Sequence, residues 1–525
     1  MSTQKVFLTL LCILISPAVL DGYKILVFNP KLGGSHVNFM GRLADTLANA
    51  GHDVVVYQPV LNENVTSTGS KAKNVRVVTL PKNESLYVGF SMTGHQQDLF
   101  DNKFDNMNDV TKHRTRFCEE ILKDHKNHDL LKAENFDLGI TEHFEVCGYG
   151  VFKLLNISKY VTSTSTALLP HFTQMLGVKP HFSYTVGLTA KYSDKMNFFQ
   201  RLRRVYDHFM ERYFVSNFME KNGVVPIQKM YPDFDPGLAF ARAAYVFANS
   251  DEYLDYVQPI TPKIVYIANL GNGAGKPLPD EYEAIVSKAK KGIVLFSFGS
   301  VLHSNIMPEH IKSAFLDAFA EFPDVTFLWK YESPEDGYTK HVPNVIARKW
   351  LPQRDLLHHP RLLAFITHGG QNSFNEAIAA GVPMLCMPVF ADQPKNAHHI
   401  ASKELGLELQ HKDLTKDKVV AALRETLGND KYRNNAQLVS NIIKKRNKWQ
   451  TPEDRFIKNV EMAAEFGDTG TLSAMGAEQS AIVFYSLDVM GFVVTVLMVL
   501  ILLIKKLVGF VVKMGSSLFV KAKSE

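Results

Sequence analysis

The hydrophobic pattern alternates between short apolar runs, typical of buried strands, and longer stretches with helical spacing. In the first half of the chain, strands are predicted at 23–29, 53–58, 75–80 and 136–141. In the second half, strands are predicted at 293–298, 325–329, 344–347, 362–367 and 382–387. Strands that alternate with helices in this way predict parallel α/β sheets. We therefore expect two Rossmann-like domains that hold a ligand in the cleft between them.

The beginning of the chain is an apolar segment outside this alternation. Lys5 precedes an apolar run that ends at Ile15, and small residues follow at 16–18. This order predicts a signal peptide at 1–18, the alternative being a buried first strand. Three N-glycosylation sequons are compatible with a secreted or lumenal body and begin at Asn64, Asn83 and Asn156.

Residues 481–504 form a second apolar segment, in which Asp488 is the charged residue. The segment is long enough to cross a membrane once as a helix. Lys505 and Lys506 follow it directly. The positive-inside rule therefore places the tail, 505–525, in the cytosol and the folded body on the lumenal side.

Positive charge is concentrated in this tail. The formal net charge is +5, and five lysines lie within 505–525 beside one acid, Glu525. The remaining chain is close to neutral and lacks the basic face that nucleic acid requires, so nucleic acid is not expected as a partner. Lys521 and Lys523 have the spacing of a K-x-K-x-x signal for retrieval to the endoplasmic reticulum. A generic basic tail is the alternative.

Three further features are not expected to form a site. Residues 233–235 have a D-x-D spacing found in some metal sites, but the Pro-Gly that follows favours a turn. Residues 271–276 depart from a phosphate loop at Leu270 and Pro277, so we interpret 271–285 as an interdomain linker. The cysteines outside the signal peptide do not predict a disulfide framework and are Cys118, Cys147 and Cys386.

The stretch from Trp350 to Asn396 carries the clearest functional pattern. It predicts a strand, a Gly-rich turn at 368–370, a helix and a second strand. The turn brings the helix amides to the carboxyl end of the first strand, where a phosphate would bind. No metal-ligating cluster of His, Asp and Glu is evident in the sequence near this turn. The residues that we select at this edge are Ser300, Trp350, Gln353, His368, Gly369, Gly370, Asn372, Ser373, Glu376, Asp392 and Gln393.

His36 and Glu142 are predicted at the matching edge of the first sheet. His36 stands where the first strand passes into its helix, and Glu142 ends the strand predicted at 136–141. Strands of one parallel sheet can bring both side chains to the same edge. Between 165 and 245 the chain is rich in aromatic residues, most of which we expect to pack in a core, while a few could line an apolar acceptor pocket.

The stretch 350–396 is similar to the UDP-glycosyltransferases, and the whole chain resembles their membrane-anchored UDP-glucuronosyltransferase branch. Shorter matches lie at 298–300, at 249–251 and at 485–489. The resemblance implies a GT-B fold, with the acceptor domain first and the UDP-sugar domain second. It also implies inverting transfer that needs no metal and no cofactor, because the UDP-sugar is a co-substrate.

The same resemblance assigns the donor to the second domain. The uracil is expected on Trp350 with Gln353 beside it, the ribose at Glu376, and the sugar at Asp392 and Gln393. The diphosphate is expected at Ser300, His368, Asn372 and Ser373.

The resemblance assigns the catalytic base to His36, whose pKa near neutrality suits proton transfer. In mammalian members an Asp orients this base, and Glu142 stands at the matching position. His143 and Glu145 are alternatives to Glu142, and a helix cap is the alternative role for His36.

The expected organisation is a signal peptide at 1–18, an acceptor domain at 19–270, the linker at 271–285, a donor domain at 286–450, a helical segment crossing back at 451–480, a transmembrane helix at 481–504 and a tail at 505–525. The expected activity is transfer of glucuronic acid from UDP-glucuronate to the hydroxyl of a small lipophilic acceptor, as in detoxification. UDP-glucose is the alternative donor, and a catalytically silent nucleotide-sugar-binding membrane protein is the alternative class. Homo-oligomerisation is left open.

Overall fold

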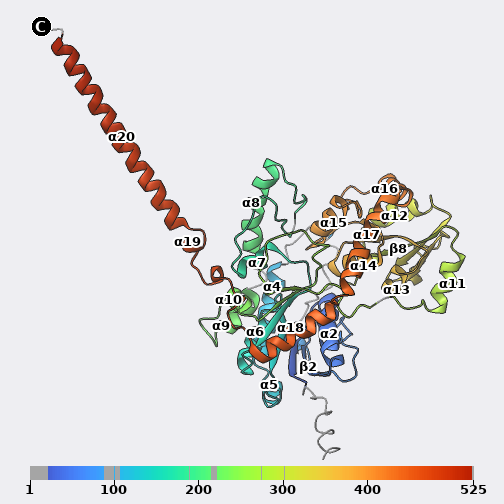
Figure 1. Cartoon of the computed structure of the whole chain (residues 1–525). Helices are drawn as coiled ribbons and strands as arrows, with labels where there is room; N and C mark the ends of the chain where they lie inside the picture. Colours follow the sequence, from blue (N-terminus) through green and yellow to red (C-terminus); the bar gives the residue numbers. More distant parts are fainter. Residues whose placement is uncertain are drawn as a thin grey trace, which may run out of the picture.

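The computed structural model describes residues 22–87, 100, 107–188, 190–214, 221–273, 275–300 and 302–522. Two parallel sheets covered by helices form the body, from which one long helix extends (Figure 1). This architecture confirms the two α/β domains predicted from the alternation of strands and helices. The predicted signal peptide lies outside the described residues.

The first sheet contains seven parallel strands in the order β3-β2-β1-β4-β5-β6-β7. Their bounds are β1 Lys24–Phe28, β2 Asp53–Pro59, β3 Arg76–Leu80, β4 Leu138–Glu142, β5 Tyr160–Thr164, β6 Val246–Ala248 and β7 Ile264–Tyr266. The strand order reverses between β1 and β4, which is where open parallel sheets bind ligands. Helix α2 (Gly34–Asn49) begins at this edge and buries Val37, Met40, Leu43 and Leu47, at the spacing that predicts a helix.

A disulfide joins two of the helices on the first sheet. Besides α2, the helices of this domain before the second sheet are α4 Met107–Leu122, α5 His125–Lys132, α6 Cys147–Leu154, α7 Pro170–Met175, α8 Phe198–Phe214, α9 Lys221–Gln228 and α10 Pro236–Ala241. Cys118 of α4 is bonded to Cys147 of α6, and their Cα atoms are 5.7 Å apart. This bond corrects the expectation drawn from the cysteine count, because pairing follows from the packing of α4 on α6. Cys386 is free and buried.

The second sheet contains six parallel strands in the order β10-β9-β8-β11-β12-β13. Their bounds are β8 Gly292–Ser297, β9 Val325–Lys330, β10 Val345–Arg348, β11 Leu362–Thr367, β12 Met384–Cys386 and β13 Gly406–Glu408. The helices of this domain are α11 Asp280–Lys288, α12 Glu309–Phe319, α13 Gln353–Leu357, α14 Gln371–Ala380, α15 Gln393–Ser402, α16 Lys416–Gly428 and α17 Asp430–Asn447. The order reverses between β8 and β11, and both strands end in a glycine turn at this place.

The connection between the two sheets is shorter than the predicted linker. Helix α11 begins at Asp280, so the last part of the predicted segment, 280–285, is helical. Its first turn contains Asp280, Glu281 and Glu283, whose negative charges favour a helix N-terminus.

Helix α18 (Pro452–Phe466) carries the chain back to the first sheet, where it lies against α2 (Figure 1). A capping box fixes its start, because Thr451 and Asp454 each bond the other's backbone amide. Phe456 is fully buried in the core of the first sheet, with its ring centroid 4.8 Å from that of Phe247 on β6. The C-terminal segment therefore completes the first domain.

Among the described residues, one helix is long and apolar enough to cross a membrane. This segment, Leu487–Ser516, belongs to α20 (Leu487–Ala522) and is not covered by the body. The short helix α19 (Ala481–Phe484) precedes it, and Ser486 between them has a φ of 56°. Because this left-handed residue interrupts the helix, the span predicted at 481–504 begins too early.

Phe456→Ala is expected to lower the free energy of unfolding by about 3–5 kcal/mol, because truncation leaves a cavity in the core shared with Phe247. A urea titration in detergent, followed by circular dichroism, measures this loss. Phe466→Ala in the same helix is the matched control, since Phe466 is 54% exposed and its truncation should change stability by less than about 0.5 kcal/mol. Equal losses in the two variants would contradict the packing of α18.

Candidate active site at the domain junction

His36 and Glu142 meet where β1 and β4 end. His36 lies in the first turn of α2, and Glu142 is the last residue of β4. Nδ1 of His36 lies 2.7 Å from Oε2 of Glu142. The Glu142 side chain is only 2% exposed, whereas the His36 side chain is 38% exposed. The imidazole is thus held through Nδ1, and Nε2 is on the opposite side of the ring.

Ser165 completes this pair and was missed by the sequence pattern. It follows β5 directly, at the same sheet edge. Its backbone amide donates to Oε1 of Glu142 at 3.0 Å, and its Oγ lies 3.0 Å from Nδ1 of His36. A polar residue directly after a strand is the signal that could have identified it, but residues 160–164 were not predicted as a strand.

The two partners shift each other's pKa in opposite directions. Burial lowers the pKa of His36, but the charge and hydrogen bond of Glu142 outweigh burial, so the pKa of His36 is raised. Burial raises the pKa of Glu142, but His36 and the bonds from Ser165 outweigh it, so this pKa is lowered. Both shifts favour the imidazolium–carboxylate pair, which makes His36 a stronger base than an isolated histidine.

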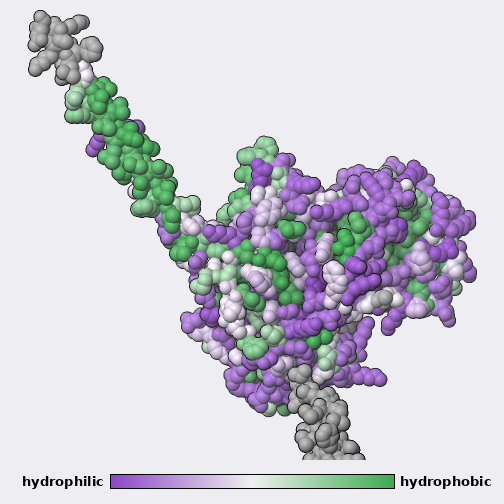
Figure 2. Space-filling model, viewed as in Figure 1, coloured by the Kyte–Doolittle hydropathy of each residue, from purple (hydrophilic) through white to green (hydrophobic). Residues whose placement is uncertain are grey.

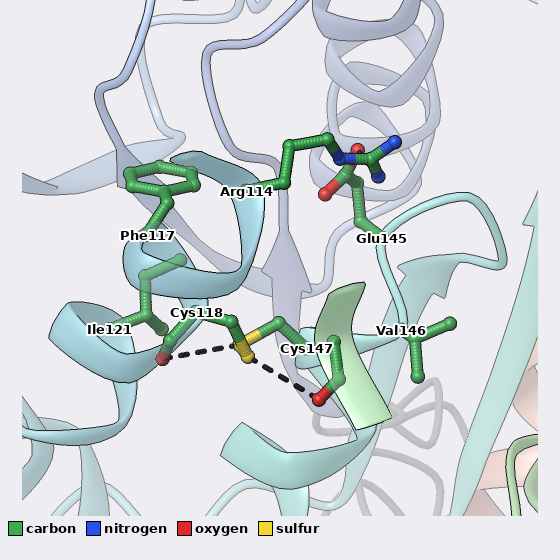
Figure 3. A pocket seen from close by; sticks show the side chains of 8 residues that line it. Arg114, Phe117, Cys118, Ile121, Glu145, Val146 and Cys147 are labelled. Atoms are coloured by element: carbon green, nitrogen blue, oxygen red, sulfur yellow. Dashed lines mark hydrogen bonds and ion pairs between the residues drawn. A yellow bond between two sulfur atoms is a disulfide. The ribbon is translucent and has the colours of Figure 1, made fainter. Parts of the chain in front are cut away.

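The loop that follows β4 is fixed by Arg114 of α4. The guanidinium donates to the carbonyl oxygen of Phe144 at 2.6 Å and to Oε1 of Glu145 at 3.0 Å. Figure 3 shows Arg114 and Glu145 beside the disulfide between Cys118 and Cys147. A cavity of about 10 Å³ lies among these residues. This volume holds about one water molecule, so the cavity is not a substrate site.

The two alternatives to Glu142 are engaged elsewhere. The ring of His143 packs among aromatic side chains, with its centroid 4.5 Å from that of Phe240. Glu145 pairs with Arg114. Of the three candidates, Glu142 is the one that contacts His36.

In the second domain, a glycine turn follows β11. Gly369 has a φ of 83°, and a Cβ at this position would lie 2.5 Å from Sγ of Cys386, so a larger residue does not fit. His368 packs against Gly299, where a Cβ would lie 2.8 Å from the imidazole. Burial and the charge of Lys330 lower the pKa of His368 to about 4. The imidazole of His368 is therefore neutral near pH 7.

Helix α14 begins after this turn, with Gly370 as its N-cap. Glycine has no side chain to cap the helix, so the first amides and the helix dipole are available to an anion. Nε2 of Gln353 donates to Oε2 of Glu376 at 2.8 Å and lies 3.3 Å from Oγ of Ser373. Burial raises the pKa of Glu376. The structure thus brings Gln353, Ser373 and Glu376 together in one group.

The first turn of α14 also contacts the first domain. Oδ1 of Asn372 accepts from Arg42 at 3.2 Å and from Nδ2 of Asn249 at 2.9 Å. Nδ2 of Asn375 donates to the carbonyl of Asn249 at 3.0 Å, and Nδ2 of Asn269 donates to the carbonyl of Asn375 at 3.0 Å. The sequence pattern missed Arg42, which lies on α2 six residues after His36.

Asp392 and Gln393 lie at the start of α15 and are both buried. Oδ2 of Asp392 accepts from Asn396 at 3.1 Å, and burial raises the pKa of Asp392. The charge of His36 acts on this carboxylate in the opposite direction. Oε1 of Gln393 accepts the backbone amides of Val389 and Phe390, so this oxygen holds the preceding turn.

Ser300 lies at the junction, whereas the contacts of Trp350 are within the second domain. Oγ of Ser300 is 3.6 Å from the position that a Cβ on Gly34 would take, so Ser300 faces the start of α2. The Trp350 side chain is largely exposed, and Nζ of Lys330 lies 5.9 Å from its ring centroid. Among the residues that the structure describes, no group of three or more His, Cys, Asp or Glu could hold a metal ion.

The aromatic region between 165 and 245 divides into two parts. Phe172 and Phe240 are buried in a cluster with Phe144, whose ring meets that of His36 edge-on at 5.9 Å. The expectation that most aromatic residues pack in a core is wrong for α8. Its exposed aromatic residues are Phe198, Phe199, Tyr206, Phe209 and Tyr213.

Solved structures share this architecture. A UDP-glucosyltransferase from Polygonum tinctorium superposes with a TM-score of 0.59 at 16% identity, over 85% of this chain and 99% of that chain. LpCGTa, solved in complex with UDP, superposes with a TM-score of 0.56 at 18% identity, over 84% of this chain and 99% of that chain. Two facing parallel sheets with a site at their junction define the GT-B fold.

The chain belongs to the family described as UDP-glucoronosyl and UDP-glucosyl transferase, which matches residues 23–522. The ugt-47 protein of Caenorhabditis briggsae is 31% identical over 505 residues, which are 93% of each chain. UDP-glucuronosyltransferase 1A9 of Homo sapiens is 28% identical over 502 residues, which are 93% of this chain and 91% of the human protein. The family resemblance found in the sequence is therefore confirmed.

Glu142→Gln is expected to lower the pKa of His36, because a neutral amide no longer stabilises the imidazolium while burial still opposes it. His36 would then become neutral at a lower pH than in the parent protein. Diethyl pyrocarbonate reacts with neutral imidazole, so the pH dependence of His36 modification, read by peptide mass spectrometry, measures the shift. Glu63→Gln, at an exposed position, is the control and should leave the midpoint unchanged. If the pH midpoint of His36 modification were the same in the parent protein, in Glu142→Gln and in Glu63→Gln, Glu142 would not set the pKa of His36.

Proposed function

We propose that the protein transfers glucuronic acid from UDP-glucuronate to the hydroxyl group of a small lipophilic acceptor, with inversion and without a metal ion. The observation that carries this proposal is the pair of His36 and Glu142 in a chain of this family. The pair lies at the start of α2, whose Gly34 and Arg42 approach the second domain. The human relative is named a glucuronosyltransferase, which supports glucuronate as the transferred sugar.

In this mechanism His36 is the general base. When the Nδ1 proton is directed at Glu142, Nε2 carries the lone pair that accepts the proton of the acceptor hydroxyl. The acceptor oxygen forms a bond to the anomeric carbon as the bond from that carbon to the β-phosphate oxygen breaks. The proton remains on His36, and Glu142 stabilises the resulting imidazolium. Attack from the side opposite to UDP inverts the anomeric carbon.

The second domain binds the donor and stabilises the leaving UDP. The uncapped amides of α14 and its dipole act on the negative charge that develops on the diphosphate, with Ser373 beside them. Glu376 accepts from the ribose hydroxyls, and the exposed ring of Trp350 stacks on uracil. Asp392, at the start of α15, accepts from hydroxyls of the sugar. In this proposal these groups are positioned before the reaction, so they reorganise little as negative charge develops on the diphosphate.

The surroundings of His36 support a lipophilic acceptor. Phe144 meets the imidazole edge-on at 5.9 Å and belongs to an apolar cluster with the buried rings of Phe172 and Phe240. An aromatic or aliphatic alcohol would lose little hydration on entering such surroundings, whereas a strongly polar one would lose hydrogen bonds.

We further infer that α20 anchors the body on the lumenal side of the endoplasmic reticulum membrane, with the lysine-rich tail in the cytosol. Within α20, the uninterrupted apolar part from 489 to 504 is followed by Lys505 and Lys506, and this order supports the orientation. The sequon residues Asn64, Asn83 and Asn156 are all exposed, as lumenal glycosylation requires.

The central test is incubation of the purified full chain with a phenol and either UDP-glucuronate or UDP-glucose, with the conjugate identified by mass. The parent protein is expected to form the glucuronide. His36→Ala should lower turnover by about 10²- to 10⁴-fold and retain UDP binding by calorimetry, because the base does not hold UDP. His125→Ala, at an exposed position of α5, is the matched control. A glucoside would reassign the donor, and unchanged turnover in His36→Ala would contradict the assigned base.

Trp350→Ala is expected to weaken UDP binding by about 1–3 kcal/mol, a rise in Kd of roughly 5- to 150-fold, because the base loses its stacking surface. Calorimetry with UDP alone measures this loss without dependence on turnover. Trp449→Ala removes another exposed indole, just after α17, and should leave the Kd unchanged. If both variants bound UDP like the parent, uracil would have to bind elsewhere.

A further inference from the structure

Helix α8 buries polar side chains and exposes apolar ones. Arg204 is fully buried, where Nε donates to the carbonyl of Thr185 at 2.8 Å and NH1 pairs with Glu211 at 3.2 Å. Asp207 is also buried and accepts from the hydroxyl of Tyr192 at 2.9 Å. These bonds fix the polar side of α8 against the body, so its apolar side faces outward.

The outward side of α8 is a continuous apolar surface. At about 100° per residue, the exposed apolar residues of α8 fall within about 120° of the helix circumference. Figure 2 shows light green at the upper end and along the left edge of this helix, with purple on the side toward the second domain. The residues that form it are between 45% and 76% exposed and are Phe198, Phe199, Leu202, Tyr206, Phe209, Met210 and Tyr213. Single exposed apolar residues are common, but such a helix side usually marks an interaction surface.

Arginines border this surface on both sides. Arg201 and Arg212 lie along one border and Arg203 along the other, and all three are exposed. The guanidinium of Arg203 lies 5.3 Å from the ring centroid of Tyr206. Aromatic residues flanked by arginine are typical of helices that lie in the interface of a bilayer, where the cations meet lipid phosphates.

The position of α8 in the fold agrees with such a role. Figure 1 shows α8 rising from the first domain on the side from which α20 leaves the body. The preceding helix α7 is joined to the segment before α20, because Nε2 of Gln174 donates to the hydroxyl of Tyr485 at 3.0 Å. Gly177 also packs against residues 476–477. When α20 spans a bilayer, these contacts hold α7 near its surface, on the side of the first domain from which α8 rises.

We propose that α8 is a second membrane contact, whose apolar side lies in the interface of the bilayer that α20 spans. The lipid surface is favoured as the occupant by the arginine borders and by the proximity of α20. The contact holds the first domain against the membrane independently of catalysis. It depends on α20 as the anchor and not on the identity of the donor sugar.

The test uses the full chain with Phe199→Cys, labelled with a polarity-sensitive fluorophore and reconstituted in vesicles of phosphatidylcholine and phosphatidylserine. Nitroxide groups high on the acyl chains should cause about a twofold loss of fluorescence at this position. Leu130→Cys on α5 is the matched control, an exposed leucine away from α20, and should be quenched by aqueous iodide and not by the lipid. The parent chain, labelled in parallel, gives the background.

Two results would overturn the proposal. Quenching of the label at 199 by iodide and not by lipid would place α8 in water. Protection from both quenchers would show that protein covers α8, for example a second copy of this chain. Retained UDP binding in each labelled variant shows that the protein is folded, so a failure of the membrane contact is distinct from a failure of the donor site.

Discussion

A carboxylate that is removed from water requires partners, and Glu142 is removed almost completely. Its oxygens are bonded by His36 and by the backbone amide of Ser165. These residues follow three strands, β4, β1 and β5, which are brought to one edge by parallel pairing. Movement of any partner would leave a charge buried and unpaired, so the stability of this edge and the orientation of the imidazole have the same cause.

The second domain meets the first through polar groups beside a few apolar contacts, in which Leu254 packs in the core of the second sheet and the ring centroid of Tyr256 lies 4.1 Å from that of His399. Asn249, Asn372 and Asn375 exchange side-chain and backbone hydrogen bonds, and Asp255 pairs with Lys395 at 2.9 Å between two buried side chains. Polar contacts of this kind define how the domains align but release less free energy than an apolar interface, and they resemble the contacts between domains that move. Such a junction suits the proposed reaction, in which the donor and the base belong to different domains.

The sequence predicts those parts of the fold that a local apolar pattern defines, including β1, β4 and β11 with their turns. It does not predict β5, because its Thr162-Ser163-Thr164 run is polar although fully buried, and Ser165 was missed for that reason. The break at Ser486 and the disulfide depend on a backbone angle and on helix packing, which spacing does not reveal. The exposed side of α8 was interpreted as core, because the burial of Arg204 depends on Thr185 and Glu211 from the folded surroundings.

The path of α18 makes the second domain an insertion within the first. The chain leaves after β7 and returns before α18, and the amide of Gly271 donates to Glu453 at 2.8 Å, so the outgoing and returning connections lie side by side. Two adjacent connections form a hinge that permits opening about one axis and opposes free rotation. Because α19 and α20 follow α18, the candidate membrane helix is attached to the first domain. With α20 fixed in a membrane, the first domain is the stationary part of the molecule, and the second domain is the part that moves about the hinge.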